Sequence, residues 1–431
     1  MSGFRKMLAV DVAALGWDLI ERQGRHSIGD LRFQPAESVF PALTCVAQAA
    51  FRTAAPGAVH GIEANGFFDR RLRRTFFWEQ SAALVGGPRL WNRFRAAGGR
   101  VTLLFWQQSL GEAVDRVLSP RPIHLHHGGM ISDCQSRPLE WSGELTGRIG
   151  RPFPLHRYWG PLAGAASSEW IVRATIEALR GDGDAPELVL SYLPHLDYDL
   201  QRFGPGHPRA GRALGTVFDW LARLRAAAAE CGYEVLFFGD YAMTATGGPP
   251  VYPNRALRAA GLLDVRGVRG RTYPDLFGSA AFAVCDHEVA LVYAADAGRA
   301  ARARDVLGAL PGVAGIAPPS GIGGDRAPDF VLTADEGRWF AYPWWTAAAE
   351  APDYAASVDI HNKPGYDPCE LRFGVPPPRI ARDPARIRGT HGRAGPGRRI
   401  AWASSAPLRP ETGDLIGLAR ALRGWLEEPL P

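Results

Sequence analysis

The 431-residue sequence has little cysteine and no long apolar run. Its five cysteines are odd in number and lack the Cys-x-x-Cys spacing, which argues against both a disulfide framework and a zinc ribbon. This usage favours a reducing compartment, so we expect a cytoplasmic protein. No uninterrupted apolar stretch reaches the roughly 18 residues of a membrane-spanning helix, and the apolar run near the amino terminus is interrupted by Asp11. We therefore expect no membrane span.

A strong charge of one sign is also missing. The 49 Lys and Arg residues exceed the 44 Asp and Glu residues only slightly, and the arginines are scattered along the chain. A small anionic substrate explains them as well as a nucleic acid would, so we expect no nucleic-acid partner. A hydrophobic fraction of 46% and a charged fraction of 22% are ordinary for a folded globular protein. The composition therefore predicts a compact enzyme.

Short apolar runs alternate with helical patterns along the first part of the chain. Apolar residues at helical spacing over Arg212–Glu230 predict a helix between the last two of these runs. Such alternation favours a mainly parallel sheet covered by helices. The predicted strands are Met7–Val10, Val101–Trp106, Leu188–Leu193 and Val235–Phe238.

Three of the predicted strands end in an aspartate or are followed shortly by one. These residues are Asp11, Asp197 and Asp240. Ligands of open α/β sheets gather beyond the carboxyl ends of the strands, so the three carboxylates can converge there. A buried aspartate needs a cation or several hydrogen-bond donors to offset its desolvation.

The pattern changes after residue 260. A strand at Val289–Tyr293 and a helix near Ala300–Leu310 precede a Gly/Pro-rich stretch over Pro311–Pro328. We interpret residues 261–346 as a smaller inserted cap, with residues 1–260 and 347–431 as the two parts of the core. A closing helix is expected at Gly413–Leu426.

Two segments in the first hundred residues place polar side chains in glycine- or proline-containing loops. Phe40-Pro41-Ala42-Leu43-Thr44-Cys45 places Thr44 before a helix, where the helix field favours an alkoxide and a bound phosphate. An ordinary helix N-cap is the alternative for this threonine. His60-Gly61-Ile62 and Asn65-Gly66-Phe67 follow, and an Asn-Gly turn is the alternative for Asn65.

Three later segments complete the set. They are Pro194-His195-Leu196-Asp197 with Gly204-Pro205, Phe238-Gly239-Asp240-Tyr241-Ala242-Met243, and Gly389-Thr390-His391-Gly392. In this order the segments resemble the motifs of the type I phosphodiesterase/nucleotide pyrophosphatase family, within the alkaline phosphatase superfamily. The resemblance runs from Met7 to Arg393. It implies an α/β/α sandwich of alkaline phosphatase type, with a mainly parallel central sheet and the cap inserted before the final histidine.

The resemblance also implies a site and a reaction. Thr44 would be the nucleophile, and the Asn65 amide would donate to a phosphoryl oxygen. Two divalent cations are implied, with Asp11, Thr44 and Asp240 around one, and Asp197 and His391 around the other. Zinc is the usual ion of the family, with manganese or magnesium as alternatives.

The sequence departs from the family pattern at two ligand positions. Gln201 and Tyr241 stand where the family has histidine, and both bind zinc more weakly than imidazole does. They remain candidate ligands. His287 and His361 are further candidates that could make up the deficit, and Lys363 could bind a phosphate oxygen as a point charge.

These features predict a hydrolase that cleaves a phosphodiester or pyrophosphate bond through a phospho-threonine intermediate. The expected substrate is a nucleotide or another small phosphorylated metabolite. The nearest alternative is a phosphonate or phosphomonoester hydrolase of the same superfamily. Because two histidines are replaced, a metal-poor pseudoenzyme that binds phosphate compounds without turnover is a further alternative.

Overall fold

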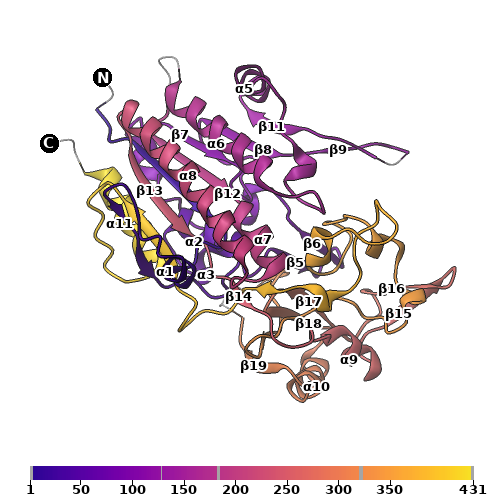
Figure 1. Cartoon of the computed structure of the whole chain (residues 1–431). Helices are drawn as coiled ribbons and strands as arrows, with labels where there is room; N and C mark the ends of the chain where they lie inside the picture. The colour runs from indigo at the N-terminus through magenta and orange to yellow at the C-terminus, as the bar shows by residue number, and fades with distance from the viewer. Residues whose placement is uncertain (1–2, 128, 182–184, 320–323, 429–431) are drawn as a thin grey trace.

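The computed structural model describes residues 3–127, 129–181, 185–319 and 324–428 and centres on an eight-stranded sheet (Figure 1). The five middle strands are parallel, whereas the strands at both edges are antiparallel. The predicted mainly parallel sheet is therefore confirmed. In spatial order the strands are β11 (Cys134–Arg137), β8 (Arg116–Pro120), β7 (Val101–Leu104), β12 (Leu188–Leu193), β1 (Met7–Val12), β13 (Glu234–Gly239), β22 (Ile400–Ser404) and β4 (Gln34–Ala36).

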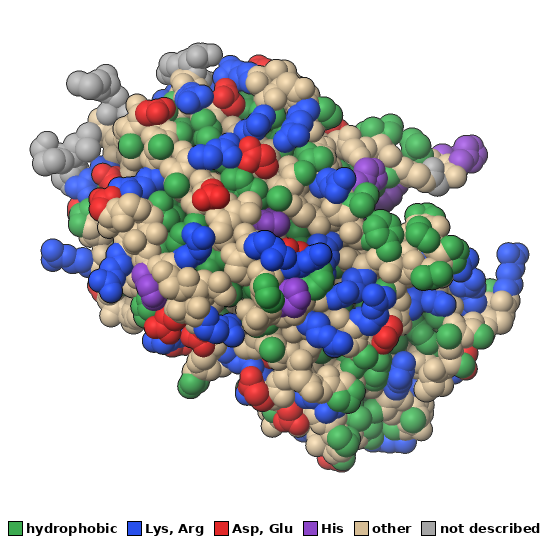
Figure 2. All heavy atoms as spheres, in the orientation of Figure 1, with side chains coloured by type: hydrophobic (Ala, Val, Ile, Leu, Met, Phe, Trp, Pro, Cys, Tyr) green, Lys and Arg blue, Asp and Glu red, His purple; other side chains and the backbone are tan. Residues whose placement is uncertain are grey.

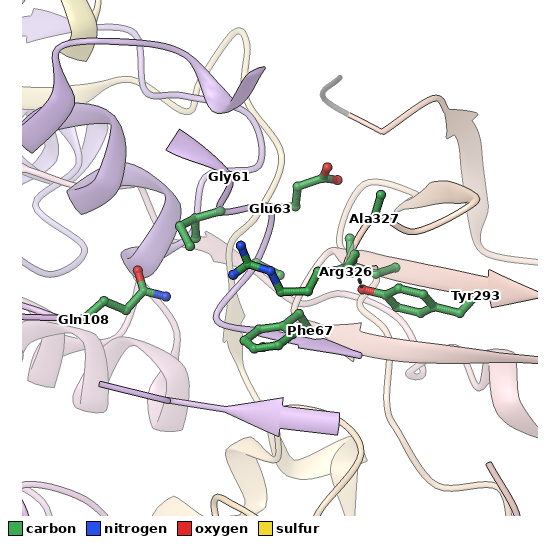
Figure 3. A pocket seen from close by; sticks show the side chains of 11 residues that line it. Gly61, Glu63, Phe67, Gln108, Tyr293, Arg326 and Ala327 are labelled. Carbon is green, nitrogen blue, oxygen red and sulfur yellow. Dashed lines mark hydrogen bonds between the residues drawn. The ribbon is translucent and has the colours of Figure 1, made fainter. Parts of the chain in front are cut away.

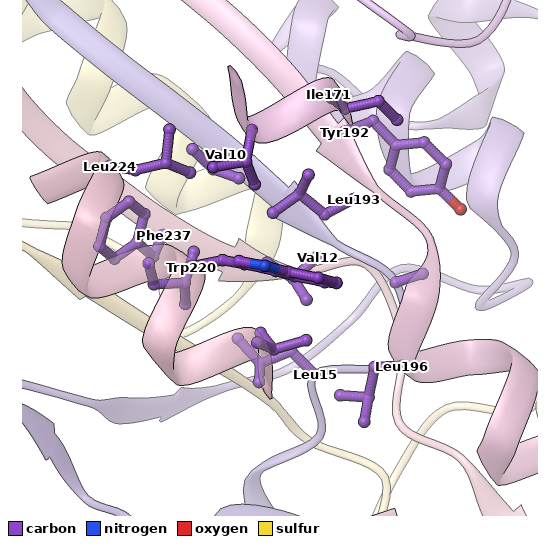
Figure 4. Close-up of a cluster of buried hydrophobic side chains, with 14 of the residues drawn as sticks. Val10, Val12, Leu15, Ile171, Tyr192, Leu193, Leu196, Trp220, Leu224 and Phe237 are labelled. Carbon is purple, nitrogen blue, oxygen red and sulfur yellow. The ribbon is translucent and has the colours of Figure 1, made fainter. Parts of the chain in front are cut away.

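Helices cover both faces of this sheet. Successive side chains of a strand point to opposite faces, so Val10 and Val12 of β1 join one core while Met7 and Ala9 join the other. The first core, which Figure 4 shows, includes residues of α5 (Trp141–Ile149), α6 (Ala165–Arg180), α7 (His195–Phe203) and α8 (Pro208–Glu230). The second includes residues of α2 (Thr44–Thr53), α4 (Asn92–Ala96) and α11 (Leu415–Glu427). The layers form the expected α/β/α sandwich.

Helix α8 shows how the sequence produces this packing. Leu214, Val217, Leu221 and Leu224 recur at helical spacing and are fully buried against the sheet. Burial of each such leucine stabilises the fold by about 1.5–3 kcal/mol. The helix begins at Pro208, four residues before the predicted start, because proline suits the first helical position.

A second, antiparallel sheet lies within the predicted cap segment. It has the order β17 (Ala281–Asp286), β18 (Val289–Ala294), β20 (Phe330–Ala334) and β19 (Val313–Ala317), and it packs with α9 (Pro253–Ala259) and α10 (Ala297–Gly308). Its core also includes Leu43 and Val46 from the start of α2. The second sheet and α2 therefore share one hydrophobic core. Its role as a cap stays a prediction.

Short elements connect these layers. The two-stranded pairs are β2 (Ser27–Ile28) with β3 (Leu31–Arg32), β5 (Gly66–Asp69) with β6 (Arg74–Phe77), β9 (Ile123–His124) with β10 (Met130–Ile131), β14 (Thr244–Ala245) with β21 (Gly389–Thr390), and β15 (Val265–Val268) with β16 (Arg271–Pro274). The remaining short helices are α1 (Trp17–Gln23), α3 (Gly57–His60) and the 3-10 turns Ala82–Leu84, Leu155–Arg157, Ala348–Glu350, Asp353–Ala356, Pro368–Leu371 and Pro384–Arg386.

The charge distribution on the surface and the length and polarity of the helices agree with the expectations from the composition. Figure 2 shows acidic and basic side chains intermingled on the face in view. Across the described ranges, every helix is too short or too polar to cross a bilayer. All five cysteines are free, and the compartment stays a prediction.

Candidate functional site

Two aspartates occupy the carboxyl ends of adjacent parallel strands. Asp11 lies near the end of β1, and Asp240 follows β13 directly. Both side chains are fully buried. Asp11 Oδ2 accepts a 2.7 Å hydrogen bond from Gln48, and Asp240 Oδ1 accepts from the backbone N–H groups of Ala14 and Tyr241. Within the described part of the chain, Asp11 Oδ1 and Asp240 Oδ2 have no hydrogen-bond partner.

The protonation of this pair reflects its surroundings. Burial raises the pKa of Asp11 to about 8. Burial also holds the pKa of Asp240 well above its usual range, and the neighbouring charge of Asp11 raises it further. Buried carboxylate oxygens without donors are rare in folded proteins, and a cation or a proton would offset their cost. The pair is therefore suited to hold a cation.

Thr44 is the first residue of α2. The N-cap is Leu43, so the alternative of an ordinary threonine N-cap is wrong. Gln48 lies one helical turn after Thr44, on the same face, and its bond to Asp11 ties that face to the aspartate pair. The Thr44 side chain also lies beside the Tyr241 hydroxyl. The helix start is thus held next to the ends of β1 and β13.

Asn65 is attached to the start of α2. Its Oδ1 accepts a 3.0 Å hydrogen bond from the Cys45 N–H. Its backbone N–H and its Nδ2 both donate to the Asp286 carboxylate, at 2.8 and 3.2 Å. Burial raises the pKa of Asp286 to about 6, and the bonds from Asn65 oppose that rise. These contacts fix the orientation of the Asn65 amide.

Asp197 differs from the other two aspartates because hydrogen-bond donors satisfy both of its oxygens. It lies in the first turn of α7, where Oδ1 accepts from the Tyr241 hydroxyl at 3.1 Å and Oδ2 from Gln201 Nε2 at 2.5 Å. Gln201 Oε1 in turn accepts from the Tyr366 hydroxyl at 2.9 Å. Burial raises the pKa of Asp197 to about 7, although the two donors lower it.

His391 follows β21 and reaches the same place from the far end of the chain. Its Nδ1 donates to the Ala42 carbonyl at 2.8 Å, and the Ala42 N–H donates to the Gly392 carbonyl. Burial holds the pKa of His391 well below its usual range, so the ring is neutral. With its proton on Nδ1, the ring presents the Nε2 lone pair.

His287 and His361, the two further candidate ligands, lie in different places. His287 is buried, donates Nδ1 to Asp286 at 2.8 Å, and has its ring 3.8 Å from that of His391. It therefore reaches the site. His361 is exposed and lies against the Phe77 carbonyl, in a surface turn. The structure does not bring it together with the aspartates.

Lys363 is not available to bind phosphate. It is 1% exposed, and its Nζ donates to the Ser357 carbonyl, Asp367 and Glu370. These three bonds use all the donors of an ammonium group. The expectation of a phosphate contact from Lys363 is therefore wrong.

The sequence patterns assigned no role to three residues of this site. Gln48 had a usable signal, because it lies four residues after Thr44 and thus on the same helix face. Asp286 directly precedes the candidate His287, and Tyr366 lies three residues after Lys363, but their contacts with Asn65 and Gln201 depend on folding.

The donor sets can be tested against the cations that the sequence predicts. Among the described residues, no three or more His, Cys, Asp or Glu side chains form a ready metal cage. Asp11, Asp240 and Thr44 supply oxygen atoms only, which fits a hard ion such as Mg²⁺ or Mn²⁺ that keeps water and binds phosphate. At Asp197, by contrast, Gln201 and Tyr241 direct hydrogen atoms at the carboxylate. This second set does not fit a cation.

A pocket lies beside the Asn65 loop (Figure 3). Gly61, Glu63, Phe67, Tyr293 and Arg326 are among the residues that line it, and in this view the Arg326 side chain extends between Gly61 and Phe67. The Arg326 guanidinium lies 5.4 Å from the centre of the Phe67 ring. The pocket therefore brings a cationic side chain close to the segment that positions Asn65.

The comparisons with known proteins agree with this geometry. The family model described as type I phosphodiesterase/nucleotide pyrophosphatase matches residues 8–367. A crystal structure of phosphonoacetate hydrolase from Sinorhizobium meliloti 1021, in complex with phosphonoformate, has a TM-score of 0.62 at 16% identity, covering 98% of this chain and 96% of that one. Murine ectonucleotide pyrophosphatase/phosphodiesterase 5 has a TM-score of 0.58 at 18% identity, with 99% and 96% covered. No curated protein sequence matches the chain.

Proposed function

Because this chain belongs to the type I phosphodiesterase/nucleotide pyrophosphatase family, a family of hydrolases, we propose that it cleaves a phosphodiester or pyrophosphate bond of a small phosphorylated metabolite. Thr44 would act as the nucleophile and form a phospho-threonine intermediate. The proposal depends above all on two carboxylate oxygens beside Thr44, one of Asp11 and one of Asp240, for which the described ranges supply no hydrogen-bond donor.

The reaction has two displacements. In the first, Thr44 Oγ loses its proton and bonds to phosphorus while the bond from phosphorus to the leaving oxygen breaks; that oxygen takes the electron pair, and the released proton goes to it or to solvent. In the second, a water oxygen loses a proton and bonds to phosphorus while the Thr44 Oγ–P bond breaks, and Thr44 Oγ takes the electron pair and a proton. A divalent cation held by Asp11 and Asp240 would supply the positive charge that lowers the pKa of the threonine hydroxyl and offsets phosphoryl charge.

The residues around Thr44 supply hydrogen-bond donors that support this chemistry. The start of α2 presents backbone N–H groups and the positive end of the helix dipole to a bound phosphoryl group. Asn65 has its amide held by Cys45 and Asp286, and its second Nδ2 hydrogen would donate to a phosphoryl oxygen. Such preorganised donors stabilise charge that develops in the transition state.

The substrate class follows from the family and from the solved neighbours. A nucleotide is our first choice, since one neighbour is murine ectonucleotide pyrophosphatase/phosphodiesterase 5 in complex with AMP. Phosphonate hydrolysis is the second candidate, because the neighbour from Sinorhizobium meliloti is a phosphonoacetate hydrolase. The stacking of the site residues Tyr241 and His391 is compatible with either substrate.

The test compares substrates, metals and one variant. Purified chain would be assayed with bis-p-nitrophenyl phosphate, p-nitrophenyl phosphate and phosphonoacetate, each with Mg²⁺, Mn²⁺ or Zn²⁺. We expect diester turnover that Thr44→Ala lowers by about 10³-fold or more. Thr53→Ala is the matched control, because that buried hydroxyl at the other end of α2 bonds only backbone carbonyls.

Each outcome selects a different function. Diester turnover that survives Thr44→Ala would exclude Thr44 as nucleophile. Preferred turnover of phosphonoacetate would replace the phosphodiesterase proposal with a phosphonate hydrolase. Binding of AMP without turnover under any metal would instead support the phosphate-binding pseudoenzyme.

A further inference from the structure

The three buried aspartates of the site fall into two kinds. Asp11 and Asp240 each keep one oxygen that lacks a hydrogen-bond partner in the described residues, whereas both oxygens of Asp197 accept bonds. All three are at least 95% buried, so contact with bulk solvent does not explain the difference. An ionised carboxylate in such a place needs either donors or a cation. Both oxygens of Asp197 have donors, whereas one oxygen of Asp11 and one of Asp240 have none among the described residues.

The donor side of Asp197 is fixed by a chain of hydrogen bonds. A carboxylate only accepts hydrogen bonds, so Gln201 must turn its NH₂ group to Asp197. The Gln201 oxygen then faces the Tyr366 hydroxyl, which donates to it at 2.9 Å. Gln201 thus uses both ends of its amide in protein contacts, and its oxygen points to Tyr366 rather than to a cation beside Asp197.

Tyr241 occupies the other side of Asp197. Its hydroxyl donates to Asp197, and its ring lies parallel to the His391 ring with centroids 3.5 Å apart. The tyrosine therefore contacts the imidazole through its ring and the carboxylate through its hydroxyl. A cation joined to both Asp197 and His391 would have to compete with the Tyr241 hydroxyl or the Gln201 amide for an oxygen of Asp197.

We propose that this chain holds a single divalent cation, between Asp11 and Asp240 beside Thr44, and that hydrogen bonds from Gln201 and Tyr241 to Asp197 close the second cation position. The two predicted cations are thereby reduced to one. The proposal shares its site with the proposed function but concerns how many ions bind, which is measured without turnover.

The first experiment counts ions. Full-length chain would be stripped with EDTA, loaded with Mn²⁺, freed of excess ion and analysed by elemental mass spectrometry, with calorimetric titration alongside. We expect one Mn²⁺ per chain. Two per chain would overturn the proposal, and so would none, because the oxygens of Asp11 and Asp240 would then be balanced by protons.

Variants assign the ion to its ligands. Asp11→Asn and Asp240→Asn should each weaken Mn²⁺ binding by about 100-fold or more, by analogy with the 10–100-fold losses from removing supporting residues alone. Asp197→Asn should keep one ion with nearly unchanged affinity. The exposed Asp219→Asn on α8 is the matched control. Loss of the ion in Asp197→Asn, with circular dichroism unchanged, would overturn the assignment.

A gain of binding gives the sharpest test. The double variant Gln201→His with Tyr241→His removes both donors from Asp197 and adds two imidazoles, so it should bind a second ion.

Tyr241→Phe is the second variant, for use if the double variant does not fold. It keeps the ring and removes only the hydroxyl. Because Gln201 still donates to Asp197, Tyr241→Phe should still bind one ion. The Mn²⁺ electron paramagnetic resonance spectrum should show an isolated ion in the unmodified chain and a coupled pair in the double variant. A coupled pair in the unmodified chain or in Tyr241→Phe would overturn the proposal.

The two proposals fail separately. One Mn²⁺ per chain without hydrolysis of any substrate would remove the proposed function and keep the single-ion site. Two ions with hydrolysis that depends on Thr44 would do the reverse.

Discussion

The ring of Tyr241 lies on the ring of His391, with the two planes 2° apart. The same tyrosine hydroxyl bonds to Asp197 in α7 and lies beside Thr44 at the start of α2. One side chain therefore joins the end of β13 to three other segments. Where the family has a histidine that would hold an ion, this chain has a residue that holds neighbouring side chains.

The first prediction concerns the stability of the cation-free protein. Asp11 has a folded pKa of about 8, against 3.8 for an ordinary aspartate, so the folded state binds the proton more tightly than the unfolded state. Its contribution therefore becomes more destabilising as the pH rises from about 4 to 8. In EDTA, Asp11→Asn should raise the Tm by several degrees at pH 8 and by little at pH 4.

The cation should reverse this difference. With saturating Mn²⁺, the unmodified chain gains stability by binding, whereas Asp11→Asn gains little. Differential scanning fluorimetry at each pH, with and without the ion, measures both effects. A Tm advantage of Asp11→Asn that is constant with pH would show that Asp11 is not the titrating group.

A second prediction uses His60, which is buried next to α2. Burial, and then the charge of Arg52, lowers the pKa of His60 to about 4. In the unfolded state His60 therefore binds a proton near pH 6.5, whereas in the folded state it binds one only near pH 4. The free energy of unfolding falls as the pH drops from 6.5 to 4. At pH 5 this costs about 2 kcal/mol.

His60→Gln should remove that loss, because the glutamine oxygen can accept the Ile62 N–H bond that His60 Nδ1 accepts. Urea unfolding at pH 7 and pH 5 gives the comparison, with the exposed His126→Gln as control. Equal pH dependence in His60→Gln and the unmodified chain would contradict the prediction.

The third prediction concerns the role of Asn65 in turnover. Asn65→Ala removes one oriented donor, so kcat on bis-p-nitrophenyl phosphate should fall by about 10²–10³-fold. The Mn²⁺ affinity should stay the same, since Asn65 bonds Cys45 and Asp286 rather than the aspartate pair. Asn362→Ala is the control, because that amide bonds Asp359 in its own surface turn. A normal kcat in folded Asn65→Ala would contradict the assignment of Asn65 as a donor to the phosphoryl group.

The fourth prediction follows from the buried ion pairs of Lys363. Lys363→Met leaves Asp367 and Glu370 without their common cation, so the free energy of unfolding should fall by about 3–5 kcal/mol. Urea denaturation measures the change, and Lys6→Met, at the chain's other lysine, is the control. Turnover per folded molecule should be retained. A variant of normal stability with a raised KM would restore Lys363 as a phosphate contact.

Sequence patterns predicted the sandwich because they are local. The apolar runs of β1, β12 and β13 and the helical spacing of α8 depend on neighbouring residues, and all four elements formed where expected. The convergence of Asp11 and Asp240 followed from a rule about strand ends. The rest depended on packing between distant segments.

Gln201 and Tyr241 illustrate that limit. The sequence showed only that two histidines were replaced, which left open whether weaker ligands remained. The structure shows amide and phenol hydrogens directed at Asp197, and it shows Tyr366 orienting the amide from 165 residues away. No local pattern carries the direction of a hydrogen bond between such distant side chains.

The loop around His391 has a consequence for biosynthesis. Ala42 accepts its bond from His391 and donates one to Gly392, so the start of α2 is fastened by a segment that the ribosome makes some 350 residues later. A nascent chain that has completed β1, α2 and β13 still lacks these two hydrogen bonds. The protein should therefore acquire a competent centre only after the segment around His391 has emerged from the ribosome.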